Sequence, residues 1–172
     1  IKVFIFKLLF KSPEYVIVNS YQFSKEIYKK FKVRAKVIYN PLNKFEILKK
    51  SKEKIYFNFS NKQSLKIINI ARFTDQKDHI TLLKAFKIIN TKINAELLIM
   101  GYGENKKIIQ NYVAKNNLEE KIKVIGFQKN PYPFIKKSDI FILSSLYEGL
   151  PNVLLEAITL KKFIISSDCP TG

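Results

Sequence analysis

The sequence predicts an α/β fold built around a doubly wound, Rossmann-like parallel sheet. Short apolar runs alternate with segments of helical periodicity along most of the 172 residues, which is typical of strand–helix–strand units. The runs are apolar without alternation, as expected of strands that helices cover on both faces. With 47% hydrophobic residues, five glycines and six prolines, the composition is that of a globular chain and excludes collagen and disordered linkers.

The first elements form one strand–helix–strand unit. We expect a strand over Tyr15–Val18, a helix over Tyr21–Phe31, whose apolar residues recur on one face, and a strand over Ala35–Tyr39. The segment Asn40–Asn43, which contains a proline, then interrupts the pattern. Residues 44–64 are lysine-rich with weak periodicity, so we expect a connector with at most a short helix.

A longer alternating series begins at Leu65. In chain order we expect strands over Leu65–Ile70, Ala95–Met100, Ile122–Ile125, Ile140–Leu143 and Phe163–Ser166, and helices over Asp78–Asn90, Glu104–Asn116, Tyr132–Lys137 and Asn152–Leu160. Ligands of such sheets bind at the carboxyl ends of the strands, so the loops after residues 70, 100, 125 and 143 are where a site is expected. The chain opens on an apolar run and stops in a loop after a strand, so we expect a fragment truncated at both ends.

The chain carries a net charge of +17, and 16 of its 31 basic residues lie within residues 1–66. Only Arg34 and Arg72 are arginines, which disfavours base readout, so we expect no nucleic-acid partner. A lysine-rich surface suits an anionic membrane or a polyanionic substrate. The alternative is that most of these lysines are merely solvated. Peripheral contact with an anionic membrane therefore stays a hypothesis.

Two residue types exclude further classes of site. The single cysteine, Cys169, excludes an internal disulfide framework and any centre that needs several thiolates. We assign no chemical role to Cys169 or to the single histidine, His79. No apolar run approaches the ~20 residues that a membrane-spanning helix needs.

Arg72 and Lys77 lie in the loop between the first strand and the first helix of the second series. Arg72 leaves the strand tip and Lys77 comes directly before the helix, so both cations can converge where free helix amides favour an anion. A diphosphate would fit there. The alternative pairs Arg72 with Asp75 or Asp78 and leaves Lys77 in solvent.

Two carboxylates, Glu148 and Glu156, stand on either side of the start of the last expected helix. Pro151 suits the first helical position, because it needs no amide donor there. Glu156 lies four positions after Asn152 and so on the same helix face, which allows both acids to border one cavity. The alternative is that Glu148 caps the helix and Glu156 is exposed to solvent.

Between these acids lies a candidate phosphate cradle. The amides of Asn152, Val153 and Leu154 are the unpaired donors of the helix start and can bind phosphate oxygens. Glu148 and Glu156 would repel the phosphates, so we expect them to accept hydrogen bonds from sugar hydroxyls at either end.

The turn Gly101-Tyr102-Gly103 joins another strand to its helix. It begins like the dinucleotide-binding fingerprint but has Lys106 where the third glycine would stand, so it is a weak nicotinamide or flavin signal. We interpret the glycines as allowing a tight turn that approaches a ligand. Gly101, Tyr102 and Gly103, with Phe127 from the next loop, are expected at the rim of the same site.

These segments together resemble a known family. The segments IARFTDQKDHITLLKAF, LLIMGYGENKK and KVIGFQKNPYPFIKKSDIFILSSLYEGLPNVLLEA are similar to the C-terminal domain of the retaining group 1 (family 4-like) glycosyltransferases with the GT-B fold. The resemblance implies that residues 1–43 are the tail of the acceptor-side domain and 44–64 a connector. Residues 65–172 would form the nucleotide-sugar donor-binding domain, incomplete at its C-terminus.

The resemblance also implies roles for the candidate residues. Arg72 and Lys77 would hold the donor diphosphate, Glu156 the ribose hydroxyls and Glu148 the donor sugar, with Arg72, Lys77 and Glu148 as the catalytic set. The amides that follow Glu148, from Gly149 onward, would complete the phosphate site. No Asp-x-Asp pair occurs, so neither a metal nor another cofactor is expected beside the nucleotide-diphosphate sugar.

The expected function is transfer of a hexose to a glycan or lipid-linked acceptor, in the cytoplasm or peripherally at the inner face of the cell membrane. Ala71 and Asp78 stand where the family often has glycines, and most of the acceptor-side domain is absent, so the fragment alone is expected to be inactive. The alternatives are a sugar-nucleotide epimerase or a non-catalytic nucleotide-sugar-binding domain. A basic nucleic-acid-binding module has only the charge in its favour.

Overall fold

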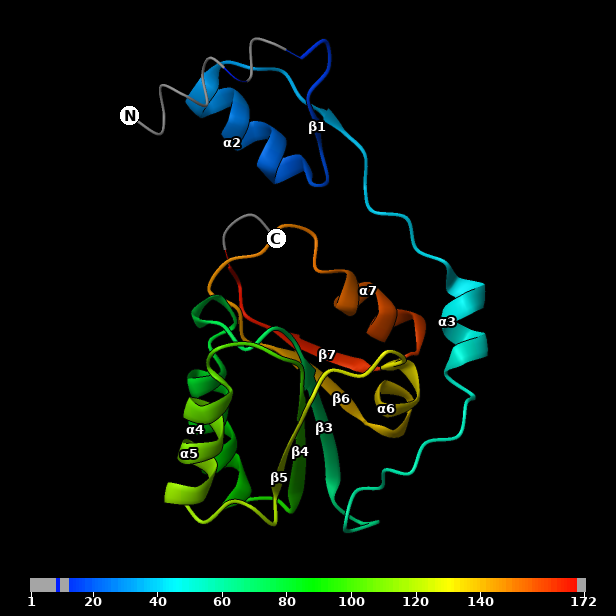
Figure 1. Ribbon diagram of the computed structural model, residues 1–172, viewed down its shortest axis with the longest axis vertical. Coiled ribbons are helices and arrows are strands. Elements are labelled where there is room, and N and C mark those ends of the chain that lie inside the picture. The colour runs from blue at the N-terminus through cyan, green and yellow to red at the C-terminus, as the bar shows by residue number, and fades with distance from the viewer. Residues whose placement is uncertain (1–8, 10–12, 170–172) are drawn as a thin grey trace. The chain divides into compact units, whose positions relative to one another are not determined.

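The computed structural model describes residues 9 and 13–169, which form two units (Figure 1). The first contains the described residues up to Pro41 together with Tyr147–Pro151 and Cys169. The second contains Leu42–Leu146 and Asn152–Asp168. The expected domain boundaries at residues 43 and 64 stay a prediction.

The first unit is built on a strand–helix–strand motif. β1 (Ile17–Val18) and β2 (Lys36–Val37) pair in parallel, and α2 (Tyr21–Phe31) connects them. The helix begins where predicted because the side chain of Ser20 accepts a hydrogen bond from the amide of Phe23 at 3.1 Å.

The second unit is a five-stranded parallel sheet in the order β5-β4-β3-β6-β7. Its strands are β3 (Leu65–Ile70), β4 (Ala95–Met100), β5 (Ile122–Ile125), β6 (Ile140–Leu143) and β7 (Phe163–Ser166), and its helices are α3 (Lys44–Lys50), α4 (His79–Asn90), α5 (Lys106–Lys115), α6 (Tyr132–Lys137) and α7 (Asn152–Thr159). The chain winds outward from β3 to β5 and then returns to place β6 on the other side of β3. The predicted doubly wound sheet is confirmed, and its switch point lies between β3 and β6.

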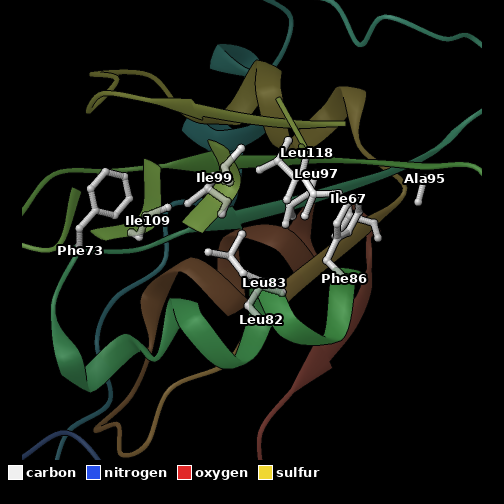
Figure 2. Packing of buried hydrophobic residues seen from close by; sticks show 12 residues of the cluster. Ile67, Phe73, Leu82, Leu83, Phe86, Ala95, Leu97, Ile99, Ile109 and Leu118 are labelled. Atoms are coloured by element: carbon white, nitrogen blue, oxygen red, sulfur yellow. The ribbon is translucent and has the colours of Figure 1, made fainter. Parts of the chain in front are cut away.

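Helices cover both faces of this sheet. α4 and α5 pack on one face around Phe86 and Ile109, and the packed side chains of this cluster are shown in Figure 2. α6 and α7 pack on the other face around Phe134 and Ala157. All six residues of β4 are buried, because its side chains alternate between the two clusters. The apolar runs without alternation therefore correctly predicted a strand buried on both faces for β4. The prediction is wrong for the edge strand β7, where Phe163 is 66% and Ile165 45% exposed.

The predicted elements all exist, and the differences lie at their ends. β1 and β2 are shorter than the predicted Tyr15–Val18 and Ala35–Tyr39, because their ladder pairs only two residues of each strand. α4 excludes Asp78, which takes a left-handed φ of 41° and caps the helix instead. α7 begins at Asn152, so Pro151 precedes the helix rather than occupying its first position. α5 begins two residues late, and α5 and α7 each end one residue early.

The connector contains one short helix, α3, and an irregular segment that Glu96 of β4 holds in place. The Glu96 carboxylate is 4% exposed and accepts hydrogen bonds from the amides of Ser60 and Asn61, at 2.6 and 2.7 Å, and from the Ser64 hydroxyl at 2.6 Å. Burial alone would raise the pKa of Glu96, but these donors bring its net shift below the ordinary value.

Candidate functional site

The candidate site lies at the carboxyl ends of β3 and β6, where the strand order reverses. In doubly wound sheets, ligands commonly bind at this point, because the loops after the two adjacent strands lead in opposite directions. Arg72 leaves β3 at this edge and is exposed, while Lys77 ends the 3₁₀ turn Asp75–Lys77 and is half-buried. The two predicted cations therefore belong to one short loop beside the switch point.

The aspartates of this loop are bonded elsewhere, so the alternative pairing of Arg72 is wrong. Among the described residues Arg72 makes no ion pair. Asp75 Oδ1 accepts a hydrogen bond from Asn105 Nδ2 at 2.7 Å, and Asp78 Oδ1 accepts one from the Thr81 amide at 3.2 Å. Asp78 therefore caps α4, in a left-handed conformation that aspartate tolerates better than most residues.

Two hydrogen bonds fasten the Lys77 loop to the loop after β6. The Ser144 hydroxyl donates to the carbonyl oxygen of Lys77 at 2.8 Å, and the Leu146 amide donates to the carbonyl oxygen of Gln76 at 2.8 Å. These bonds span the switch point and fix the backbone that carries the Lys77 side chain.

The Gly101-Tyr102-Gly103 turn holds the same loop from the side of β4. A Cβ atom on Gly101 would collide with the carbonyl oxygen of Ala71, and one on Gly103 with that of Phe73. The Phe73 amide also donates to the carbonyl oxygen of Tyr102 at 2.6 Å. The glycines thus permit close approach to the Arg72 loop. That they also allow the turn to approach a ligand stays a prediction.

Two exposed aromatic rings lie at the same edge, after β4 and β5. Tyr102 is 59% exposed and Phe127 is 66% exposed. Their ring centroids lie 5.9 Å apart at an interplanar angle of 88°. An edge-to-face pair of this kind leaves ring faces open for stacking with a planar ligand.

Glu156 lies on α7 and is half-buried, which contradicts the alternative that it is exposed to solvent. Its Oε1 accepts a hydrogen bond from the Tyr132 hydroxyl of α6 at 3.4 Å. Burial raises the pKa of Glu156, and the bond from Tyr132 acts in the opposite direction. Such a carboxylate can accept further hydrogen bonds from neutral hydroxyl donors.

The start of α7, which was predicted to bind phosphate, has one exposed and two half-buried residues. Asn152 is exposed, whereas Val153 and Leu154 are half-buried and pack against the cluster under α6 and α7. Packing of these two side chains fixes the orientation of the first amides of α7.

Glu148 and Gly149 belong to the first unit, within the segment Tyr147–Pro151. Glu148 is 8% exposed, and a Cβ on Gly149 would lie 3.6 Å from Asn19 Oδ1. Arg72, Lys77, the glycine turn and α7 therefore all belong to the second unit, whereas Glu148 does not. That these groups form one site stays a prediction.

Three residues with a structural part in this site were not identified from the sequence. They are Ser144, Asn105 and Tyr132, which bond Lys77, Asp75 and Glu156 respectively. Serine, asparagine and tyrosine are common in loops and helix starts, so no local pattern distinguishes them.

The described residues contain no group of three or more acidic, histidine or cysteine side chains placed to hold a metal ion. Nor do they include a helix of the length and hydropathy that crossing a bilayer requires.

Known proteins resemble this chain over most of its length. Two relatives are the uncharacterized glycosyltransferase MJ1059 of Methanocaldococcus jannaschii, 37% identical over 97% of this chain and 43% of its own length, and the N-acetylgalactosamine-N,N'-diacetylbacillosaminyl-diphospho-undecaprenol 4-alpha-N-acetylgalactosaminyltransferase of Campylobacter jejuni, 27% identical over 98% and 45%. The chain thus spans less than half the length of these relatives.

Solved structures share the fold. Anabaena Alr3699/HepE in complex with UDP-glucose matches with a TM-score of 0.73 at 20% identity, over 91% of this chain and 45% of that protein. The family model described as Glycosyl transferases group 1 matches residues 50–172. Given this match and the parallel α/β sheet, which matches GT-B structures, the chain belongs to the group 1 glycosyl transferases.

Proposed function

We propose that this chain is the donor-binding part of a retaining hexosyltransferase that uses a nucleotide-diphosphate sugar. The observation that carries the proposal is the β3 loop with Arg72 and Lys77, which Ser144 fastens across the switch point at 2.8 Å. UDP-glucose, with which the Anabaena protein forms a complex, has the chemistry that this arrangement suits.

The diphosphate would lie between the two cations and the start of α7. Arg72 provides a bidentate fork, and Lys77 provides a point charge. The amides of Asn152, Val153 and Leu154 lie at the start of α7, so they would add donors together with the positive end of the helix dipole. Cleavage of the bond to the sugar moves negative charge onto the diphosphate, so these fixed groups stabilise the transition state more than the bound donor.

We assign the ribose, the base and the sugar of the donor to other side chains of the chain. Glu156, held by Tyr132, would accept hydrogen bonds from the ribose hydroxyls. The exposed rings of Tyr102 and Phe127 offer stacking surface for the base. Glu148 is assigned to the sugar by the family resemblance.

The reaction we propose breaks the bond between C1 of the sugar and the diphosphate oxygen, and forms a bond from C1 to an acceptor oxygen on the same face. The acceptor proton passes to the leaving diphosphate. In this scheme Arg72 and Lys77 balance the charge of the leaving group, so we propose that no metal ion is needed.

The acceptor is proposed to be a glycan or a lipid-linked sugar. The Campylobacter relative is named for a diphospho-undecaprenol acceptor, and a lipid-linked acceptor would require contact with a membrane at its cytoplasmic face. Because the chain spans less than half of its relatives, we propose that transfer needs the longer protein and that this chain alone only binds the donor.

Calorimetric titration of the chain with UDP, GDP and ADP tests donor binding. Arg72→Ala and Lys77→Ala should each weaken binding of the preferred nucleotide by about 10- to 150-fold, as for loss of one charge-assisted hydrogen bond. Lys84→Ala on the exposed side of α4 is the matched control and should bind like wild type. Unchanged affinity in both Arg72→Ala and Lys77→Ala would show that the diphosphate does not bind at this loop.

Activity of the longer protein separates the remaining alternatives. Incubation with donor alone should leave the sugar configuration unchanged, whereas an epimerase would release the epimer without an acceptor. Transfer to a membrane-extracted glycolipid with retention at C1, read by the anomeric coupling in NMR, is the expected result. Donor binding without transfer to any acceptor would indicate a non-catalytic domain.

A further inference from the structure

One face of α2, in the first unit, combines lysines with exposed tyrosines. This α2 basic face consists of Tyr21, Lys25, Tyr28, Lys29 and Lys32, the last being the C-cap of the helix. All five residues are exposed, with Tyr21 at 61% and Tyr28 at 48%. Their spacing of three and four places them along one side of the helix, away from the side of Ile27, which is 3% exposed.

The ammonium groups and the rings of this face contact one another. Lys25 Nζ lies 4.5 Å from the Tyr21 ring centroid, and Lys32 Nζ lies 5.5 Å from that of Tyr28. The acidic residue of α2, Glu26, is half-buried and lies on another side of the helix. The charged groups of the α2 basic face are therefore all cationic, and two of its lysines lie over its two tyrosine rings.

A hollow adjoins the α2 basic face within the same unit. Its volume is about 410 Å³, and it is lined by Ser24, Lys25, Tyr28, Arg34 and Ala35. Lys25 and Arg34 place two positive charges at a space large enough for a phosphate group with its ester substituent. Arg34 adds the planar fork that binds phosphate oxygens in pairs.

We propose that the α2 basic face, with Arg34, binds the anionic headgroups of a phospholipid bilayer. Lysines attract an anionic membrane surface, and tyrosine rings favour the membrane–water interface, where one end is apolar and the other is wet. A nucleic-acid backbone is the competing polyanion, and lysines bind it as well. The exposed tyrosines favour the membrane instead, because tyrosine rings are enriched at the membrane–water interface. The proposal does not depend on the proposed function, because it concerns a different unit and no donor.

Vesicle sedimentation with the 172-residue chain tests this surface. Binding to vesicles of phosphatidylcholine with 30% phosphatidylglycerol should exceed binding to pure phosphatidylcholine, and should fall when salt is raised from 0.1 to 0.5 M, about the range over which screening removes exposed charge interactions. Lys25→Gln, Lys29→Gln and Lys32→Gln combined should lower the partition coefficient about 100-fold, since each lysine near such a surface contributes about fivefold.

The matched control removes the same net charge elsewhere. Lys84, Lys92 and Lys115 are exposed lysines of the second unit, and their triple glutamine variant should keep binding within about threefold of wild type. Equal losses in the two triple variants would show that net charge alone binds the vesicles and would overturn the assignment to α2. Absence of vesicle binding, or tighter binding to a DNA duplex than to vesicles, would overturn it as well, while leaving the glycosyltransferase proposal intact.

Discussion

The Tyr132 hydroxyl donates a hydrogen bond to Oε1 of Glu156 across 3.4 Å, joining the start of α6 to the middle of α7. The bond is long, and both side chains are partly buried. It orients a carboxylate whose pKa burial raises, and it leaves the second oxygen of that carboxylate for another donor. Burial raises the pKa of the Tyr132 phenol, and the nearby Glu156 carboxylate raises it further.

Replacement of Tyr132 by Phe tests whether this bond orients Glu156 for the ribose. A long, partly exposed hydrogen bond is worth about 0.5–1 kcal/mol, so Tyr132→Phe should weaken UDP binding about two- to fivefold. The loss should be smaller for 2′,3′-dideoxy-UDP, which lacks the hydroxyls that Glu156 would bind. An equal loss for both nucleotides would mean that Tyr132 acts on the fold rather than on the ribose contact.

Removal of the Ser144 hydroxyl should loosen the backbone of Lys77. We expect Ser144→Ala to weaken UDP binding about three- to tenfold, in line with about 1 kcal/mol for a hydrogen bond to a carbonyl, and to leave the weak binding of uridine unchanged. Calorimetry with both ligands measures this, and Ser144→Thr should restore affinity because it keeps the hydroxyl.

The matched control for this variant is Ser138→Ala. The Ser138 hydroxyl also donates to a backbone carbonyl, that of Ile135 at 2.7 Å, but at the end of α6. This variant should lower the free energy of unfolding by about 1 kcal/mol without weakening UDP binding. If Ser138→Ala weakened nucleotide binding as much as Ser144→Ala, general destabilisation would explain both effects.

The fold was predictable because each element has a local cause in the sequence. The buried strand β4 is a run of apolar residues interrupted only by Glu96, and α2 starts at a capping serine. The residues that hydrogen-bond the candidate site residues could not be predicted from a local sequence pattern. Ser144 bonds a residue 67 positions earlier and Tyr132 one 24 positions later, so these contacts depend on the strand order, which periodicity does not specify. The cations Arg72 and Lys77 were identified because both follow the end of a predicted strand.

Substitution of Gly103 by alanine tests how closely its turn packs against the Arg72 loop. Its φ is 145°, and a Cβ there would overlap the carbonyl oxygen of Phe73 and lie 2.9 Å from its amide nitrogen. Backbone atoms cannot move aside as a flexible side chain can, so Gly103→Ala should lower the free energy of unfolding by about 2–4 kcal/mol. It should also weaken UDP binding by displacing Arg72.

Gly126→Ala is the control for this substitution. An added Cβ at Gly126, which follows β5, meets no atom within 4 Å, so its unfolding midpoint in urea should change little. Similar midpoints for the two alanine variants would contradict the close packing at Gly103.

His79 should make the stability of the fold depend on pH. The side chain is 3% exposed against Phe73, with ring centroids 5.3 Å apart, and neither ring nitrogen has a hydrogen-bond partner among the described residues. Burial lowers the pKa of His79 to about 4 from 6.5, an effect that Asp78 opposes and Lys77 adds to. The folded state therefore keeps the imidazole neutral at pH values where the unfolded chain binds a proton.

The sign of the effect follows from this difference in proton binding. The contribution of the neutral His79 side chain to the free energy of unfolding is fully present above pH 6.5. It is lost as the pH falls from about 6.5 to about 4, by about 3 kcal/mol in all. Urea unfolding of the wild type and of His79→Phe between pH 7.5 and 5 measures it. His79 is the only histidine of the chain, and few carboxylates titrate between pH 7 and 5. The free energy of unfolding of His79→Phe should therefore fall much less over this range than that of the wild type. The same decline in both proteins would mean that the imidazole is solvated or protonated in the folded state.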